Sequence, residues 1–347
     1  MANDSAPSVG ASAGQRREYL RVASRVQESP GILIDLRRPE VTQGLLGTWL
    51  RCRREAKYFL QGWNPLQIND AFQYGDMAHQ VLDRAYRWHR KHGKVPSKQA
   101  VLKMVDHSFN LREDRLLQGT DSGKLLEILH QQHAAVRAIL PEYIKFWKED
   151  FDTHAYEWAR PEKVFRLRFG RFVISGKMDG AVRSRDKLLW LFESKNYSRI
   201  NEGEMIHTLW RDLQVNLYVW ALRKITGEHP AGAVYNILRK TSLTYRKGDS
   251  PSEFEDRVRE HVKADPKHYF KRMEITISHK DQKLFDDELT EHLELFWAWL
   301  KGGMKSPRFG MPCVQKWGMC RYLNLCYYGE TRGYEKRKVL YPELVEE

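Results

Sequence analysis

The chain of 347 residues contains no apolar run approaching the ~20 residues that a membrane-spanning helix requires. Its first residues also lack the pattern of a secretory signal, in which positive charge precedes an apolar stretch. Both absences argue against a membrane protein and favour a cytoplasmic location. Disulfides are rare in the cytoplasm, so we do not expect the four cysteines to form a disulfide framework.

Positive charge is in excess, since 58 Lys and Arg oppose 45 Asp and Glu and leave a formal net charge of +13. Such an excess favours an anionic partner, of which nucleic acid is the commonest, although a basic but otherwise ordinary enzyme is the alternative. Aromatic residues make up 12% of the chain, which suits a large core and also base stacking. No G-x-x-x-x-G-K-S/T phosphate loop is present, so any unwinding of a duplex would have to come from a partner.

The clearest change in the spacing of apolar residues falls near residue 160. Up to about residue 160 the spacing is helical, with a basic helix over 42–61, a second over 75–92 and helices broken near 119–123 and at Pro141. After Pro161 it has a period of two, typical of strands. The later expected elements are strands at 163–169, 172–182, 187–193, 232–240 and 269–277, and helices at 202–226 and 281–300.

The stretch GKMDGAVRSRDKLLWLFESK, residues 176–195, has the form of a β-hairpin with chemistry on it. Asp179 lies within its first strand and Glu193 at the end of its second. Carboxylates in strands built for burial need compensation, which a shared divalent cation can supply. Lys195 shares the face of Glu193, while the Ser194 side chain points away and leaves its carbonyl oxygen towards the site. The hairpin therefore predicts a metal site.

The order of helix, three strands, helix and strand around these residues resembles the PD-(D/E)XK nuclease superfamily, and within it the RecB-type branch. The matching segments are GDMAHQVLDRAY, GKMDGAV, FESKNY and QVNLYVW, which carry His79, Asp179, Glu193 with Lys195, and Gln214 with Tyr218. The resemblance implies an α/β fold, in which helices flank a mixed central sheet, decorated by a helical insertion and a cysteine-clasped C-terminal loop region.

Nucleases of this branch that carry an iron-sulfur cluster, among them CRISPR-associated RecB-like and AddB-type nucleases, place one cysteine before the core and three after it. This chain is similar, with Cys52, Cys313, Cys320 and Cys326. The resemblance implies a 4Fe-4S cluster with one thiolate per iron. Six residues separate Cys313 from Cys320, where the compact pattern has two, and Zn²⁺ could use the same four ligands.

The resemblance also assigns roles to the site residues. Asp179, Glu193, the Ser194 carbonyl and His79 would hold Mg²⁺ or Mn²⁺. Asp179, Glu193 and Lys195 would be catalytic, with Lys195 orienting the attacking water or neutralising developing charge. His79 favours manganese over magnesium, because imidazole is a borderline ligand. Gln214 and Tyr218, one helical turn apart, would hold the nucleotide beside the scissile phosphate.

These features predict a metal-dependent exodeoxyribonuclease acting on single-stranded DNA or DNA ends in recombination, repair or replication. The alternatives are a non-catalytic accessory DNA-binding protein of recombination or CRISPR adaptation and a zinc-stabilised nucleic-acid binder. A helicase or recombination partner is compatible with the prediction, whereas polarity of digestion and oligomeric state are not determined by the sequence. The expected segments are a disordered N-terminus (1–30), N-terminal helices (31–95), helical insertion (96–160), nuclease core (161–301), iron-sulfur loops (302–335) and tail (336–347).

Overall fold

The computed structural model describes residues 31–66, 70–117, 123–150, 157–198, 201–308, 313–315 and 318–345. They belong to two compact units. The central unit is Asn69–Leu293, and the terminal unit combines Met1–Ile68 with Glu294–Glu347. The N-terminal segment expected to be disordered lies outside the described residues. Among the residues that are described, no helix is both long and apolar enough to cross a membrane.

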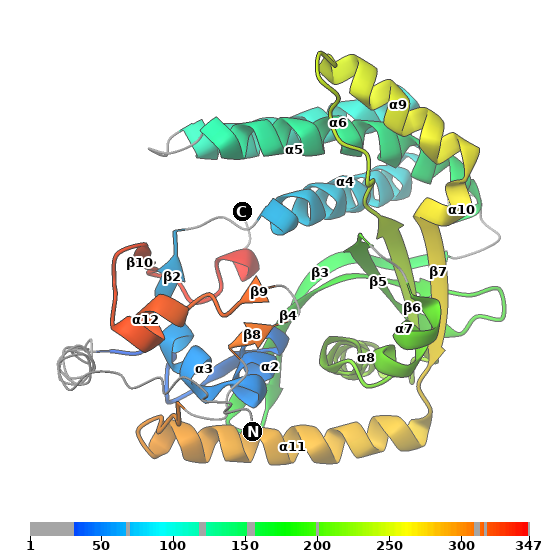
Figure 1. The fold of residues 1–347 in the computed structure, drawn as a ribbon. Helices are drawn as coiled ribbons and strands as arrows, with labels where there is room; N and C mark the ends of the chain where they lie inside the picture. The colour runs from blue at the N-terminus through cyan, green and yellow to red at the C-terminus, as the bar shows by residue number, and fades with distance from the viewer. Residues whose placement is uncertain are drawn as a thin grey trace, which may run out of the picture. The chain divides into compact units, whose positions relative to one another are not determined.

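The central unit is built around a mixed sheet (Figure 1). Its strands lie in the order β3-β4-β5-β6-β7, and every neighbouring pair is antiparallel except β5 with β6. A parallel pair needs a crossover connection, which helices α7 (Glu202–Leu209) and α8 (Leu213–Thr226) provide. The strands are β3 (Glu157–Phe169), β4 (Phe172–Arg183), β5 (Leu189–Tyr197), β6 (Gly232–Arg239) and β7 (Phe270–Thr276). The expected mixed sheet flanked by helices is confirmed.

Strand β3 begins earlier than the sequence predicts. The prediction places its start after Pro161, where the apolar spacing changes to a period of two. In the structure Pro161 lies within the strand, opposite Gly180, and close to a register shift between Trp158 and Arg160. Such irregularities are places where a strand tolerates proline.

The single helix expected over 202–226 is two helices, α7 (Glu202–Leu209) and α8 (Leu213–Thr226). The break is at Asp212, whose side chain accepts hydrogen bonds from the backbone N–H groups of Gln214 and Val215. A carboxylate at this position caps a new helix, so it ends the preceding one. Helix α8 stops at Gly227, which has φ of 75° and can adopt the left-handed conformation without strain.

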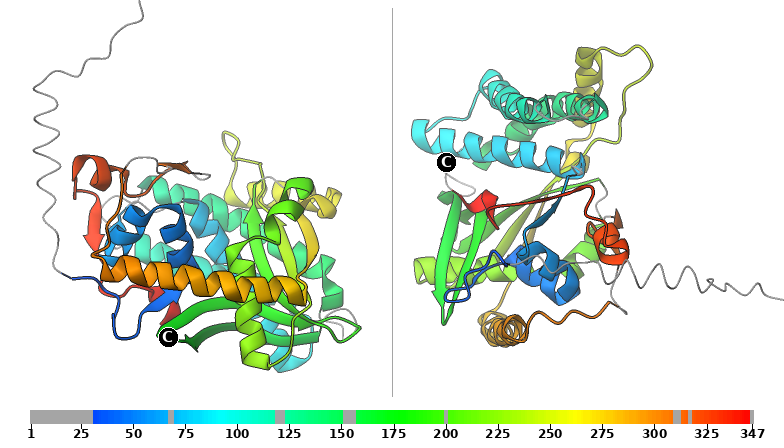
Figure 2. Two further views of the ribbon diagram at one scale, coloured as in Figure 1. Left: turned by 90° about the horizontal axis from the view of Figure 1, so that it is seen from below. Right: turned by 90° about the vertical axis from the view of Figure 1, so that its left-hand side faces the viewer.

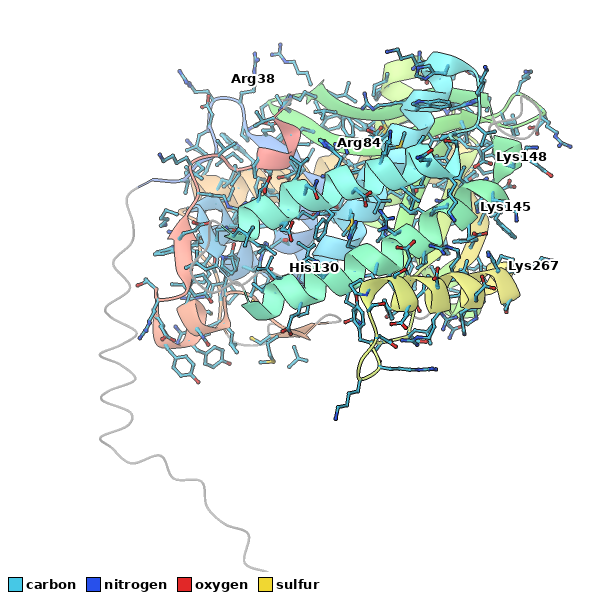
Figure 3. The ribbon with its side chains drawn as sticks, turned by 90° about the horizontal axis from the view of Figure 1, so that it is seen from above. Arg38, Arg84, His130, Lys145, Lys148 and Lys267 are labelled. Carbon is cyan, nitrogen blue, oxygen red and sulfur yellow. The ribbon has the colours of Figure 1, made fainter. Side chains whose placement is uncertain are left out.

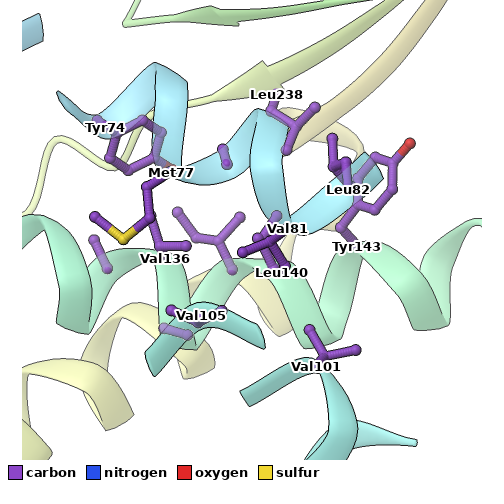
Figure 4. Packing of buried hydrophobic residues seen from close by; sticks show 14 of the residues in the cluster. Tyr74, Met77, Val81, Leu82, Val101, Val105, Val136, Leu140, Tyr143 and Leu238 are labelled. Carbon is purple, nitrogen blue, oxygen red and sulfur yellow. The ribbon is translucent and has the colours of Figure 1, made fainter. Parts of the chain in front are cut away.

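Helices α4, α5, α6, α9 and α10 pack together as a helical layer (Figures 1 and 2). The segment predicted as an insertion, 96–160, contributes α5 and α6 to it. The layer buries a cluster that includes Val81 of α4, Val105 of α5, Val136 of α6 and Leu238 of β6 (Figure 4). The expected break at Pro141 is wrong, because α6 continues through it and buries Leu140 and Tyr143 on either side. The elements are α4 (Asp70–His92), α5 (Lys98–Leu117), α6 (Gly123–Phe146), η1 (Lys148–Asp150), α9 (Pro251–Ala264) and α10 (Pro266–Tyr269).

Basic side chains are present on the outside of this layer. Lys145, Lys148 and Lys267 are exposed, and they are labelled in Figure 3 together with Arg84 of α4. They come from α6, η1, α10 and α4, which are far apart in the sequence. The central unit therefore shares in the positive charge of the chain.

The terminal unit joins the two ends of the described chain, since β2 pairs antiparallel with β10 and places Pro65 opposite Tyr334. The expected continuous helix over 42–61 is wrong. Cys52 interrupts it with extended backbone angles, φ −153° and ψ 105°. The elements of this unit are β1 (Glu40–Thr42), α2 (Gln43–Arg51), α3 (Arg53–Leu60), β2 (Trp63–Pro65), β8 (Val314–Gln315), β9 (Gly318–Met319), α12 (Leu323–Tyr328), β10 (Tyr334–Lys336) and η2 (Pro342–Leu344). The boundary between the units falls within α11 (His279–Lys301).

Candidate active site

The hairpin of β4 and β5 brings Asp179 and Glu193 together. Its register runs from Arg183 opposite Leu189, next to the turn, to Gly180 opposite Phe192. Asp179 and Glu193 are the next residue on each strand. The ladder hydrogen bonding changes there, because the backbone N–H of Ser194 donates to Asp179 Oδ2 at 2.7 Å. This side-chain bond fixes the first carboxylate against the second strand.

His79 reaches the same carboxylate from helix α4. Its Nδ1 lies 3.3 Å from Asp179 Oδ2, and the two side chains are about one-quarter and one-fifth exposed. Helix α4 can present this residue because Ala78, Val81 and Leu82 are buried in the helical layer. The structure therefore brings His79 and Asp179 together, as the sequence predicts for two residues of one site.

Glu193 forms a closed triangle with Lys195 and Gln214. The ammonium of Lys195 donates to Glu193 Oε1 at 2.6 Å and to Gln214 Oε1 at 2.9 Å. The amide nitrogen of Gln214 donates to the same Glu193 oxygen at 2.8 Å. Gln214 lies in the first turn of α8, two residues after the Asp212 cap. The start of a new helix at this point, which the apolar spacing does not predict, places Gln214 at the site.

Among the described residues, the second oxygen of Glu193 has no hydrogen-bond partner. Oε2 is buried and accepts no hydrogen bond within the described part of the chain, and the side chain is 1% exposed. A buried acceptor without a partner is costly, so such groups usually meet water or an ion. This atom is the clearest sign that the site is built for a ligand.

The ionisation of the site follows from burial and neighbouring charges. Burial raises the pKa of Glu193 to about 7, although the Lys195 ammonium opposes the rise. Burial would also raise the pKa of Asp179, but His79 and the Ser194 N–H reverse the effect and hold it below its usual value. The pKa of Lys195 would fall on burial, yet Glu193 and Asp179 raise it. A carboxyl with pKa near neutrality becomes a better cation ligand as it ionises.

Tyr218 differs from Gln214 in its surroundings. Its side chain is 7% exposed, and its ring meets Phe165 edge-on at a centroid distance of 5.6 Å. Burial raises its pKa. A side chain added at Gly176 would come within 2.9 Å of the ring, so only glycine fits beside it. The structure therefore packs Tyr218 in the core and gives Gln214 the polar contacts of the site.

Two residues that the sequence reasoning missed line the site pocket. Asp83 and Tyr86 lie one and two turns after His79 on α4, and they border the pocket together with His79, Asp179 and Ser194. Asp83 is held by two 2.8 Å contacts to Arg87. The spacing of four and seven residues from His79 was the available signal, because such residues share a helix face.

A buried polar network lies behind Ser194. The Ser194 hydroxyl accepts a 3.0 Å hydrogen bond from Asn236 on β6, and Asn236 Oδ1 accepts one from Tyr143 at 3.1 Å. Arg272 of β7 donates to Tyr143 and to Asp150 of η1. The network therefore links the site strand to the neighbouring strands and to the helical layer.

The four cysteines line one pocket within the terminal unit. Cys52, Cys313, Cys320 and Cys326 are all free thiols, and Arg54, Tyr58 and Tyr322 border the same pocket. Burial raises the pKa of Cys320 to about 11. Across the part of the chain that is described, no three His, Cys, Asp or Glu side chains are arranged so that they could hold a metal ion as they stand. The pocket gathers the four sulfurs without setting a coordination geometry.

Two carboxylates and a lysine thus lie on adjoining strands of a mixed sheet. The family model of the PD-(D/E)XK nuclease superfamily matches residues 41–327, and the chain belongs to this superfamily. It is accordingly a nuclease of the class that hydrolyses phosphodiester bonds in DNA, typically with Mg²⁺ or a similar divalent cation.

No curated protein matches the chain. A solved structure described as "Crystal structure of SSO0001" is similar to it with a TM-score of 0.24 and 12% sequence identity, over 79% of this chain and 82% of that chain.

Replacing Gln214 by Met should lower the cleavage rate by about tenfold to a hundredfold, because a hydrogen bond to a charged group contributes about 1.5–3 kcal/mol. Methionine keeps the volume but can neither accept from Lys195 nor donate to Glu193. Initial rates at saturating DNA measure the effect. Gln99→Met, an exposed residue of α5, is the matched control, and a rate equal to that control would contradict a positioning role.

Proposed function

We propose that the protein is a metal-dependent exodeoxyribonuclease acting on single-stranded DNA or DNA ends in recombination, repair or replication. Membership of the nuclease superfamily supports the reaction. The RecB-type order of His79, Asp179, Glu193 with Lys195, and Gln214 supports an exonuclease. The net charge of +13 suits a polyanionic substrate.

One observation carries the proposal, namely the unpartnered Oε2 of Glu193 beside Asp179, His79 and Lys195. A divalent cation would satisfy this oxygen and ionise the carboxyl. Asp179, the Ser194 carbonyl and the His79 imidazole would complete the protein ligands. When bound, such a cation polarises the phosphoryl group and lowers the pKa of a water molecule.

The protein's own groups would do the remaining work. Lys195, held by Glu193 and Gln214, would neutralise charge that develops on the phosphate or orient the attacking water. Gln214 would hold the Lys195 ammonium in its orientation towards the substrate. Contact of Gln214 and Tyr218 with a nucleotide stays a prediction. His79 makes Mn²⁺ a better cofactor than Mg²⁺ in this proposal, because imidazole suits manganese better.

A cleavage time course tests the proposal. Single- and double-stranded DNA labelled at the 5′ or 3′ end would be incubated with Mg²⁺, Mn²⁺ or EDTA. Progressive shortening from one end of single strands, with either cation and not with EDTA, is expected. Internal cuts in circular DNA would contradict the exonuclease, and binding without any cleavage would favour the accessory DNA-binding alternative.

We further propose that the cysteine pocket of the terminal unit binds a 4Fe-4S cluster, with Zn²⁺ as the alternative occupant. The four cysteines that line one pocket support it, because four thiolates are the ligand set that such a cluster needs. The extended backbone at Cys52 also supports it, because it takes this side chain off the buried face of the expected helix. The cluster would strengthen a junction that β2 and β10 already form.

Cys320→Ser should remove the brown colour of anaerobically purified protein and lower its melting temperature. A loss of about 2 kcal/mol corresponds to about 4–8 °C in a domain of 150–250 residues. Absorption spectra, iron and zinc analysis and thermal melts measure the effect. Val314→Ser, whose side chain is 72% exposed next to Cys313, is the control. Colourless wild-type protein without iron would refute the cluster, and zinc in its place would identify the alternative.

A further inference from the structure

The turn between α7 and α8 exposes a tryptophan. Trp210 is 43% exposed, and Ile206 on the preceding turn of α7 is 55% exposed. Of the tryptophans whose side chains the structure describes, Trp210 is the most exposed, whereas Trp190 and Trp220 of the same unit are 7% and 2% exposed. An exposed indole one turn after an exposed isoleucine offers apolar surface that a flat ligand can cover.

The tryptophan is presented on a rigid turn. Asn216 of α8 donates from its amide to the carbonyl oxygens of Trp210 and Asp212, both at 2.9 Å. Asp212 in turn caps α8, and the backbone N–H of Arg211 donates to Thr208 at 3.2 Å. The backbone on both sides of the ring is therefore fixed, so binding there would cost little ordering entropy.

The ring has a cationic neighbour. The guanidinium carbon of Arg211 lies 4.8 Å from the centroid of the Trp210 ring, within the range of a cation–π contact. An exposed aromatic ring beside an arginine suits an unpaired nucleotide, because the base can stack on the ring while the phosphate meets the guanidinium. A paired duplex hides the base faces, so the complementary ligand is a single strand.

The turn lies close to the active-site residue Gln214 in the sequence. Trp210 precedes Gln214 by four residues, which span at most ~14 Å of chain. This length corresponds to about four nucleotides at the ~3.4 Å rise of a stacked strand. Gln214 itself contacts Lys195 and Glu193. A strand with one phosphate at the site could thus reach the ring.

We propose that Trp210, with Arg211, is a stacking site for an unpaired base of the DNA strand whose phosphate occupies the active site. The inference rests on the proposed nuclease function and deepens it, since it assigns the substrate as single-stranded at the site. Stacking is sequence-tolerant, so this contact would add affinity for any base.

Fluorescence anisotropy with labelled oligothymidine in EDTA tests the inference without cleavage. Trp210→Ala should bind about tenfold more weakly than wild type, within the ~1–3 kcal/mol that one stacked base contributes, and Trp210→Phe should bind nearly as tightly as wild type. An oligonucleotide whose nucleotides are abasic should bind Trp210→Ala and wild type alike. Leu284→Ala, which removes a 54% exposed side chain elsewhere in the central unit, should change nothing.

The outcomes separate this inference from the proposed function. Wild-type protein that cleaves DNA, together with Trp210→Ala that binds oligothymidine as tightly as wild type, overturns the stacking site alone. Equal weakening of abasic and normal strands also overturns it, because the ring would then act on the backbone or on the fold. Wild-type protein that neither binds nor cleaves DNA overturns the proposed function and the stacking site with it.

Discussion

Lys195→Ala should lower the rate of DNA cleavage by about a hundred- to a thousandfold, the usual cost of removing one group that stabilises developing charge. The Lys195 side chain is 28% exposed, so it can meet a substrate phosphate, and its ammonium is oriented by hydrogen bonds to Glu193 and Gln214. Binding of DNA in EDTA should stay close to that of the wild type, because one phosphate contact among many contributes little to affinity. Single-turnover cleavage rates and anisotropy measure the two quantities.

Lys224→Ala is the matched control for this variant. Lys224 is an exposed residue in the last turn of α8, so its loss changes the net charge equally without touching the site. The fold should tolerate Lys195→Ala, since the buried Glu193 carboxyl, with a pKa near 7 even beside the lysine, can take up a proton. Cleavage at the rate of Lys224→Ala, or loss of DNA binding in EDTA, would refute the catalytic assignment of Lys195.

The core of the candidate site follows from the sequence because strand alternation is a strict local rule. Glu193 and Lys195 must share a face of β5, and the turn between the strands must bring Asp179 opposite them. The hairpin boundaries were close for this reason, with β5 extending from Leu189 to Tyr197 where 187–193 was predicted. The contacts of Lys195 with Glu193 and of Ser194 with Asp179 are consequences of that register.

The contribution of Gln214 could not be derived in the same way. The apolar period runs through 202–226 without interruption, and the side chain of Asp212 decides that the helix stops and restarts. An aspartate within a helical pattern is compatible with a continuous helix and with a cap. The same holds for Cys52, where a helical period continues across a residue that is extended in the structure.

The polar network behind the site was beyond sequence reasoning for another reason. Asp150 and Arg272 are 122 residues apart. Asp150 follows the amphipathic helix α6, and Arg272 lies within strand β7. Charged residues in such segments are usually at the surface, and only the packing of β7 on the helical layer buries this pair. Long-range pairing of this kind depends on the assembled fold.

Asp150→Leu should destabilise the protein by about 3–5 kcal/mol, because it leaves the Arg272 guanidinium buried without its counter-charge. The two side chains are 2% and 7% exposed, and the carboxylate also accepts a 3.0 Å hydrogen bond from Tyr86. Arg272 lies 3.9 Å from the ring centroid of Trp147, so aromatic contact remains but cannot replace the carboxylate. Urea unfolding followed by circular dichroism measures the loss.

A double-mutant cycle gives this prediction its sharpest form. Arg272→Met alone should also destabilise, since Asp150 would then be a buried unpaired carboxylate. The combined variant should recover most of the loss, because an apolar pair of similar volume often equals a buried ion pair in stability. Lys263→Met, which breaks an exposed pair with Glu260, is the control and should cost at most about 1 kcal/mol. Losses that simply add in the double variant would contradict direct coupling of the two charges.

The same cycle tests whether the network supports the active site. Arg272 donates hydrogen bonds to Asn236 and Tyr143. Asn236 in turn donates to the Ser194 hydroxyl, and the backbone N–H of Ser194 donates to Asp179. The double variant should be nearly as stable as wild type, because it leaves no unpaired buried charge. It should nevertheless cleave DNA more slowly, because Asn236 has lost the hydrogen bond that Arg272 donates. Stability and rate would then separate in one protein, and wild-type cleavage by the double variant would limit the network to a structural role.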